Sequence, residues 1–343
     1  MMTKRNVFTT LLMLALLASF GAVYAQDATP EVTPETTGDA MTNPDMVVAV
    51  REGLFPEGVE YDSVNGRFLV GSLAEGTVFA VADDGTVTPF VEDERIPSST
   101  GIEVDEAGNR LLVAVTNRET EAFLGIYDLT SGENLAFVDF APLLPNDPEH
   151  FANDVAVDSQ GNAYVTDSFA GVIYRVDPQG NASVFLEDQR FSTQFALNGI
   201  TYNEAGNYLI AVLVPGLIKI PLDNPGGFTQ VALDMDIPNE DGIVFIDDRT
   251  LAVVSNALGT VFRVESDDDF ESARVTGAFE VGPVFPTTAA IRNGDVYVLH
   301  AQINQQQNVI AEFPIQRVEF SDLTGMETAE PEAEMTPEAT AEG

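Results

Sequence analysis

An oxygen-bearing side chain recurs at one position of a pattern that repeats six times along the chain. In each copy the recurring residue leads into a small residue or aspartate and then an apolar run. The six recurring residues are Glu57, Thr100, Asn153, Asn198, Asp241 and Thr288. Four of them carry a carboxylate or a carboxamide. If the copies surround a common axis, equivalent positions lie at equivalent radii, and these four side chains would converge on one point.

Four convergent oxygen donors suit a hard divalent cation. Calcium takes six to eight oxygen ligands, so the carboxylates of Glu57 and Asp241 and the carboxamides of Asn153 and Asn198 would form part of its shell. Zinc prefers histidine or cysteine, and the chain has no cysteine. Alternatively, Asn, Asp and Glu before glycine are simply turn residues that enter strands. The fourfold recurrence favours a metal site, with calcium as the expected ion.

Other polar residues near these positions have several possible roles. The hydroxyl groups of Thr100 and Thr288 are expected to bind water or substrate. Asp154 follows Asn153 directly, so it should tighten the turn or orient that ligand from behind. His150 lies three residues before Asn153; it either approaches the mouth of the site or is a solvated loop residue.

Two further polar residues occupy the ends of predicted strands. Asp167 and Asn256 end comparable strands in different copies. This position is typical of hairpin turns, so neither residue is expected to be a metal ligand.

The spacing of the copies indicates the elements that carry these residues. The copies recur every 43 to 53 residues, as expected for four-stranded propeller blades. Segments such as 163–167 and 172–176 alternate β-branched and aromatic residues between Gly, Asn and Asp turns. We therefore predict an all-β fold, a six-bladed β-propeller of four-stranded antiparallel blades around a central channel. The segment 46–50 should add a strand to the last blade and close the ring.

The longest interval between copies contains a proline-rich stretch. Residues 140–151 read FAPLLPNDPEHF and end just before Asn153. Two interpretations remain open for this loop: a lid over the site, or a cover for apolar surface.

The two ends of the chain differ in composition from its middle. Residues 1–25 resemble a secretory signal, with Lys4 and Arg5 before an apolar run and small residues near Ala25. Residues 26–45 and 324–343 are rich in Ala, Thr, Pro and acids, which predicts a disordered linker and a disordered tail around a propeller at 46–323. No later stretch is long and apolar enough to span a membrane. We expect a secreted or otherwise extracytoplasmic protein, and a monomer.

The net negative charge of the chain disfavours several classes of binding partner. There are 55 acidic and 15 basic residues, a formal net charge of −40. Such a charge disfavours nucleic acid, anionic membranes and highly phosphorylated substrates, so a neutral small molecule is expected instead. Common signatures of serine hydrolases, zinc proteases and phosphate-binding loops are absent from the sequence.

The residues also resemble a known family of six-bladed proteins, gluconolactonase and senescence marker protein (regucalcin), including its calcium-dependent phosphotriesterase-like branch. The resemblance covers about residues 55–301 and is clearest in 153–168, 197–200 and 241–243. It implies that Glu57, Asn153, Asn198 and Asp241 hold a channel metal and that Asp241 is also the catalytic base. Sugar-lactone members carry arginine two residues before the first asparagine, where this chain has Phe151, so gluconolactone specificity is not expected.

Two functions follow as expectations. The first is a secreted, divalent-metal-dependent hydrolase of the lactonase or esterase kind, in which the ion polarises a carbonyl or phosphoryl oxygen and Asp241 accepts a proton from water. The second is a non-catalytic propeller, stabilised by calcium, that binds an extracellular partner or a glycan.

Overall fold

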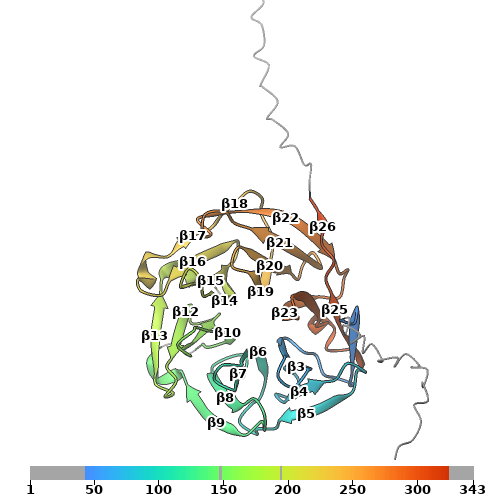
Figure 1. The fold of residues 1–343 in the computed structure, drawn as a ribbon. Helices are drawn as coiled ribbons and strands as arrows, with labels where there is room; N and C mark the ends of the chain where they lie inside the picture. The colour runs from blue at the N-terminus through green and yellow to red at the C-terminus, as the bar shows by residue number, and fades with distance from the viewer. Residues whose placement is uncertain (1–42, 147–148, 194, 324–343) are drawn as a thin grey trace, which may run out of the picture. The chain divides into compact units, whose positions relative to one another are not determined.

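A computed structural model describes residues 43–146, 149–193 and 195–323. In these residues the chain forms six β-sheets arranged in a ring, as Figure 1 shows. The predicted six-bladed propeller is therefore confirmed. The predicted signal segment, most of the linker and the acidic tail lie outside the described residues. No helix in the described part is long and apolar enough to cross a membrane.

The first three blades are regular four-stranded meanders. Blade 1 contains β2 (Val59–Asp62), β3 (Arg67–Val70), β4 (Val78–Val81) and β5 (Val87–Val91). Blade 2 contains β6 (Ser99–Asp105), β7 (Arg110–Thr116), β8 (Ala122–Asp128) and β9 (Asn134–Asp139). Blade 3 contains β10 (Ala152–Val157), β11 (Ala163–Asp167), β12 (Val172–Val176) and β13 (Ala182–Glu187).

The other three blades vary this plan. Blade 4 contains β14 (Leu197–Asn203), β15 (Tyr208–Leu213), β16 (Leu217–Pro221) and β17 (Thr229–Gln230). Blade 5 contains β19 (Glu240–Asp247), β20 (Thr250–Ser255), β21 (Thr260–Glu265) and β22 (Ser272–Glu280), and the short strands β18 (Ala232–Leu233) and β26 (Ser321–Asp322) widen its outer edge. Blade 6 contains β23 (Pro286–Arg292), β24 (Asp295–His300), β25 (Glu312–Arg317) and β1 (Met46–Val50).

The ring is closed by strand β1, which comes from the other end of the propeller sequence. Met46 pairs with Gln316 and Val50 with Glu312 in an antiparallel ladder on β25. The expected closure is therefore confirmed. The segment that leads into blade 1 is thus tied to the last blade by main-chain hydrogen bonds, with β1 as the outermost strand of blade 6.

The core is divided among the contacts between blades. Six clusters of buried apolar side chains each combine residues of two neighbouring blades. In one of them, the blade 1 residue Phe68 packs against Tyr297 of blade 6, with ring centroids 5.2 Å apart. Each blade therefore depends on both neighbours to bury its two faces, and the ring positions its innermost strands as one unit.

The long loop before blade 3 covers part of this core. It begins with the 3-10 helix η1 (Ala141–Leu143), next to the buried ring of Phe140. Phe140 stacks on Tyr174 with centroids 4.2 Å apart, and Leu143 and Leu144 pack on the cluster between blades 2 and 3. These contacts favour a cover for apolar surface over a lid. The other 3-10 helices are η2 (Gln189–Phe191), η3 (Pro225–Gly227) and η4 (Ile303–Gln305).

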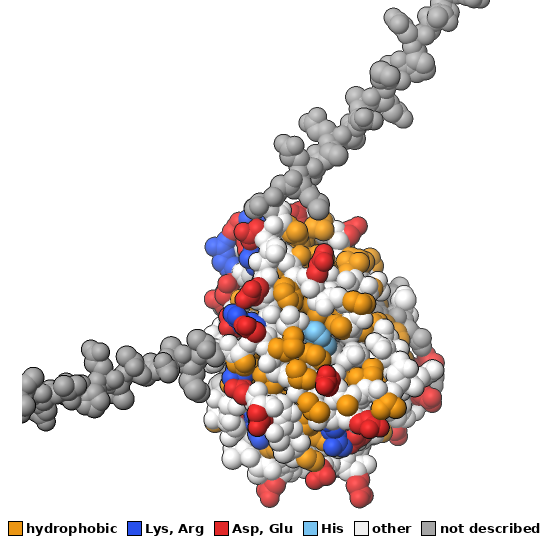
Figure 2. Space-filling model, turned by 90° about the vertical axis from the view of Figure 1, so that its right-hand side faces the viewer, with side chains coloured by type: hydrophobic (Ala, Val, Ile, Leu, Met, Phe, Trp, Pro, Cys, Tyr) orange, Lys and Arg blue, Asp and Glu red, His pale blue; other side chains and the backbone are white. Residues whose placement is uncertain are grey.

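Acidic side chains are spread over the face shown in Figure 2, where apolar side chains gather in the centre and lysine and arginine are fewer. This distribution agrees with the excess of acidic over basic residues in the chain.

Candidate metal centre

A β-bulge positions the recurring residues of five blades. In each innermost strand the ladder to the next strand slips by one residue, for example between Ala152 and Val155. The extra residues fall in the pairs 100–101, 153–154, 198–199, 241–242 and 287–288. A bulge bends the strand and redirects its side chains. Here the bulge interrupts the alternation of side chains between the two faces of the sheet, so the first residue of each pair need not follow that alternation.

The register changes the assignment in blade 6. The bulge there lies between Pro286 and Ala289, so the first bulge residue is Thr287. The alignment of the six repeats had placed Thr288 at this position. Thr288 occupies the second bulge position, which it shares with Asp154 of blade 3. The sequence of blade 6 has no glycine at this point to mark the register.

Glycine fills the second position in the other three bulged blades, as Gly101, Gly199 and Gly242, because the innermost strands approach closely there. A Cβ atom on Gly101 would lie 2.7 Å from the Cα of Asp154, and one on Gly242 would lie 2.6 Å from the Cα of Thr288. Both distances are below normal van der Waals contact. Asp154 and Thr288 are the two second-position residues that carry a side chain, and both line the central cavity.

The four predicted donors line a single small cavity. Glu57, Asn153, Asn198 and Asp241 surround a space of about 30 Å³ at the centre of the ring, together with Asp154. This volume is above the roughly 10–15 Å³ that a buried site needs to hold a water molecule. The fold thus brings together side chains up to 184 positions apart in the sequence, at a scale that suits an ion and not an organic molecule.

Hydrogen bonds orient the amide groups around this cavity. The side-chain nitrogen of Asn153 donates to Ser168 Oγ at 2.9 Å, which leaves its carbonyl oxygen for the cavity. The side-chain nitrogen of Asn256 donates to Asp241 Oδ2 at 3.0 Å. The prediction that Asn256 serves only a turn was therefore incomplete, because it also holds the candidate base.

Burial raises the pKa values of the carboxyl groups that line the cavity. Burial raises the pKa of Asp241 to about 7, and the charge of Asp154 adds to the effect, against hydrogen bonds from Asn256 and Asn198. Burial, then Asp241 and Asp154, raises the pKa of Glu57 well above its ordinary range. Glu57 is half-buried and lines the cavity.

Asp154 links the cavity to the next blade. Its Oδ2 accepts the backbone N–H of Ile200 at 2.9 Å. Burial nevertheless raises its pKa to about 6. Asp154 therefore connects blades 3 and 4 beside the cavity and adds a carboxyl group to its lining, and its expected role in orienting Asn153 stays a prediction.

Two further carboxyl groups lie deeper in the channel. Glu60 and Glu103 line the same cavity, each three positions beyond the recurring residue of its blade. Burial raises the pKa of Glu60 to about 8, and burial together with the charge of Glu60 raises that of Glu103 well above its ordinary range. The sequence analysis missed both, although their equal offset from Glu57 and Thr100 was a usable signal.

The threonines of the first bulge position connect blades instead of facing the cavity. The Thr100 hydroxyl is buried and donates to the backbone oxygen of Ala152 at 2.8 Å. The Thr287 hydroxyl donates to the backbone oxygen of Glu57 at 2.6 Å. The expectation that Thr100 binds water or substrate is therefore wrong, whereas Thr288 does line the cavity.

The fold has many relatives of known structure. The major allergen Mala s 1 of Malassezia sympodialis matches with a TM-score of 0.69 and 18% identity, over 81% of this chain and 97% of the allergen. A gluconolactonase of Xanthomonas campestris matches with a TM-score of 0.59 and 14% identity, over 79% of this chain and 89% of the enzyme. The calcium-binding protein regucalcin of Agrobacterium tumefaciens matches with a TM-score of 0.54 and 18% identity, over 78% and 92%.

This is a gluconolactonase- and regucalcin-like propeller fold. The resemblance expected from the sequence is thus confirmed for the fold. No family model and no curated protein matches the sequence. At these identities the similarity establishes architecture, so the activity has to be argued from the site itself.

The donor set of this propeller fits a divalent cation better than any neutral occupant. The side chains that line the cavity include five carboxyl groups and no lysine, arginine or histidine. In the described part of the chain, no three Asp, Glu, His or Cys side chains are grouped closely enough to hold an ion by themselves. An ion here would need the amide oxygens of Asn153 and Asn198 as well. Mixed carboxylate and carboxamide oxygens suit calcium.

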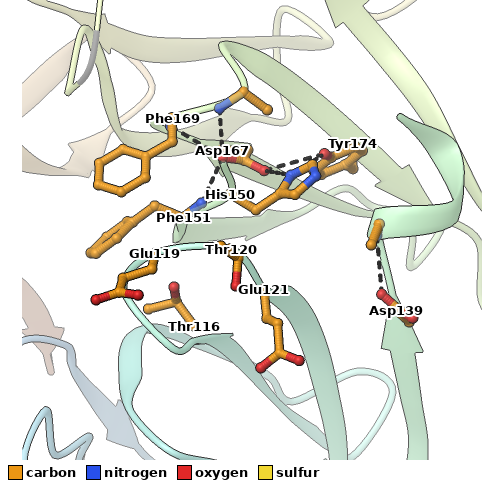
Figure 3. Close-up of polar contacts among 12 residues, drawn as sticks. Thr116, Glu119, Thr120, Glu121, Asp139, His150, Phe151, Asp167, Phe169 and Tyr174 are labelled. Carbon is orange, nitrogen blue, oxygen red and sulfur yellow. Dashed lines mark hydrogen bonds and ion pairs between the residues drawn. The ribbon is translucent and has the colours of Figure 1, made fainter. Parts of the chain in front are cut away.

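His150 lies outside the cavity and supports the loop beside it. It is buried, with 1% of its surface exposed, and its Nδ1 lies 2.8 Å from Asp167 Oδ2 (Figure 3). The Tyr174 hydroxyl donates to the same carboxylate oxygen at 3.2 Å. The interpretation of His150 as a solvated residue is therefore wrong, and the structure makes it part of a buried network that fixes Asp167.

Asp167 in turn holds the residues on either side of the mouth of blade 3. Its Oδ1 accepts the backbone N–H groups of Phe151 at 2.8 Å and Phe169 at 3.1 Å. This confirms that Asp167 organises the β11–β12 turn. Phe151 and Phe169 also contact the half-exposed ring of Phe195, and the sequence analysis had not singled out the latter two.

Proposed function

We propose that the protein is a divalent-metal-dependent hydrolase of small neutral lactones or esters. The observation that carries the proposal is the convergence of Glu57, Asn153, Asn198 and Asp241 on one cavity without a neutralising cationic side chain. Buried carboxyl groups with raised pKa values in a central channel are typical of functional sites.

The four donors would hold the ion, and calcium is the ion that their oxygen chemistry favours. The similarity to a calcium-binding regucalcin supports the same choice. When bound, such an ion acts as a Lewis acid that polarises a carbonyl or phosphoryl oxygen.

Asp241 is the proposed general base. A neighbouring cation favours its carboxylate form, which can then take a proton from a water molecule that attacks the substrate. Asn256 and Asn198 hold the carboxylate in place by hydrogen bonds. Burial raises the pKa of Glu57 well above its ordinary range, and a bound cation would favour the carboxylate form in which Glu57 acts as a ligand.

Export remains part of the proposal, on the basis of the apolar segment near the N-terminus of the sequence. A neutral substrate suits a channel whose lining is rich in carboxyl groups, because an anion would be repelled from it.

The proposal is tested by thermal melts of the chelated protein titrated with calcium, magnesium, manganese and zinc. An ion present at about 100 times its dissociation constant should stabilise the native state by about 2.7 kcal/mol. Asn198→Ala and Asp241→Ala should abolish the shift. Asn181→Ala is the matched control, because Asn181 is an exposed turn residue of blade 3 that bonds Asp177.

Turnover is then measured on a panel of lactones, esters and phosphotriesters. We expect metal-dependent hydrolysis that Asp241→Asn removes while much of the metal affinity remains. A metal shift without turnover on the panel would favour the non-catalytic binding propeller. No shift with any divalent ion would remove the basis of both metal binding and catalysis.

A further inference from the structure

We propose that Phe151, Phe169 and Phe195 form a subsite at the channel mouth for the apolar acyl or aryl group of the substrate. We call these three residues the aromatic cluster. The inference rests on the proposed hydrolase function and specifies its substrate class: lactones or esters with a substantial apolar substituent.

The aromatic cluster is a closed set of ring contacts. Phe151 lies 5.2 Å from Phe169 and 5.5 Å from Phe195, and Phe169 lies 5.0 Å from Phe195, between ring centroids. The rings meet tilted or edge to face, which is the favourable arrangement for aromatic pairs. In Figure 3 the rings of Phe151 and Phe169 point to the same side, away from the buried His150 network.

The cluster lies at the end of the channel where the candidate ligands are. Phe151 precedes the ligand Asn153 by two residues, and Phe195 precedes the ligand Asn198 by three. Ser168 connects them: its hydroxyl accepts from Asn153 at 2.9 Å, and its backbone oxygen accepts the N–H of Phe195 at 3.1 Å.

The cavity between the ligands is too small for an organic substrate. A volume of about 30 Å³ has room for an ion or a water molecule. Only the reacting oxygen of a substrate could reach it, so the remaining atoms must lie at the mouth. The aromatic cluster offers apolar surface at that place.

Phe195 presents an exposed apolar ring at this place. Its side chain is 49% exposed, and its backbone has φ of +60°. Phe55 and Phe270 also have positive φ but are buried, so the exposure of the ring, and not its backbone conformation, distinguishes Phe195. An exposed ring offers a large apolar contact area to a ligand.

The cluster is also held in place before any ligand arrives. The backbone N–H groups of Phe151 and Phe169 donate to Oδ1 of Asp167. His150 and Tyr174 contact the other carboxylate oxygen, Oδ2, of the same residue. Such preorganisation reduces the entropy lost on binding.

The surroundings favour a neutral group over an anion. In Figure 3 the carboxylate of Glu119 lies on the same side as the rings of the cluster. Arg118 is nearby in sequence, but its guanidinium donates to Ser98 Oγ at 3.2 Å and to the backbone oxygen of Leu73.

The chain contains no tryptophan, so Phe195→Trp creates a single fluorescent reporter in the cluster. The probes are 5-hexyl-2-pyrrolidinone and 5-phenyl-2-pyrrolidinone, lactams that resist hydrolysis, with unsubstituted 2-pyrrolidinone as reference. The substituted lactams should change the emission and bind at least about tenfold more tightly than the reference, since apolar burial contributes about 0.8 kcal/mol per methylene.

Calorimetry then compares variants that keep Phe195. Phe151→Ala and Phe169→Ala should each lower the affinity for the hexyl lactam about fivefold or more, and leave 2-pyrrolidinone unaffected, because a truncated ring removes apolar contact. Phe151→Leu should restore most of the affinity. Phe137→Ala is the matched control, since it truncates the Phe123–Phe137 pair on blade 2.

The failure of this inference is distinct from the failure of the proposed function. Chain-length-dependent lactam binding without hydrolysis of γ-decalactone would retain the subsite and argue against the hydrolase. Hydrolysis of γ-decalactone and γ-butyrolactone with equal kcat/KM, unchanged in the cluster variants, would overturn the subsite and retain the hydrolase. If the emission of the Phe195→Trp variant does not respond to any lactam, the subsite is overturned. The subsite is also overturned if the protein self-associates and the Phe195→Ser variant does not, because the exposed ring would then form a contact between two copies of the chain.

Discussion

The side-chain amide of Asn256 donates a hydrogen bond of 3.0 Å to the carboxylate of Asp241. The two residues lie on paired strands of blade 5 or just beyond them, Asp241 in β19 and Asn256 directly after β20. A residue at the end of a hairpin strand therefore sets the orientation and the charge preference of the candidate base.

Removal of the hydrogen bond between Asn256 and Asp241 should raise the pKa of Asp241. The hydrogen bond from Asn256 lowers the pKa of Asp241 against the effect of burial, so Asn256→Ala should raise that pKa. If the metal-loaded protein hydrolyses lactones as proposed, the acidic limb of kcat/KM against pH should then shift to higher pH. An unchanged limb, with kcat/KM lowered equally at every pH, would show that Asn256 only supports the fold.

The metal-free protein should be more stable in mild acid than at neutral pH. The folded pKa of Asp241 is about 7 and lies above its ordinary value, so the native state binds the proton more tightly than the unfolded chain. Stability is then lost as pH rises from about 4 to about 7, by on the order of a few kcal/mol for such a shift. The raised pKa values of Asp154 and Glu57 act in the same direction.

Melts of the chelated protein from pH 5 to pH 8 measure this effect. Saturating calcium should reverse or flatten the trend, because an ion beside the carboxylates lowers their pKa values and binds better as protons leave. A chelated protein whose stability rises with pH over this range would contradict the assigned electrostatics of the cavity.

The ring of glycines around the cavity should tolerate no side chain. Gly242→Ala places a Cβ atom 2.6 Å from the Cα of Thr288, and the strands must separate. We expect a loss of about 1–3 kcal/mol in the free energy of unfolding, as for other overpacked sites. Chemical denaturation in chelator measures it without any contribution from metal.

Gly226 provides the control for this substitution. A Cβ atom there meets no atom within 4 Å, so Gly226→Ala should leave stability nearly unchanged. Equal stability of the Gly242→Ala and Gly226→Ala variants would show that the innermost strands do not pack as closely as described.

Phe151→Arg should change substrate preference from apolar to polar. It places a bidentate donor at the position where sugar-lactone propellers resembling this one carry arginine, and it removes one ring of the aromatic cluster. The ratio of kcat/KM for γ-decalactone to that for gluconolactone should fall by about tenfold, equivalent to roughly 1.4 kcal/mol. A ratio that does not change would remove Phe151 from the determinants of specificity.

The strand pattern and the spacing of the repeats were sufficient to predict the six blades and their closure. Four-stranded blades have a characteristic length, and strands such as 163–167 show β-branched and aromatic residues between turns. The convergence of Glu57, Asn153, Asn198 and Asp241 followed from the same repetition, because equivalent positions in a ring lie at equal distances from its axis.

The sequence of this protein by itself determined the blade count, the central donors and their oxygen chemistry, since these depend on local periodicity and residue type. Only the tertiary structure decided the register of blade 6, where the first bulge residue is Thr287, and the hydrogen bond of Thr100 to the backbone of Ala152 in the neighbouring blade. It also decided the burial of His150 behind Asp167 and the meeting of Phe151, Phe169 and Phe195. Bulges, burial and ring contacts depend on how neighbouring blades pack, and the period of a single strand carries no information about its neighbours.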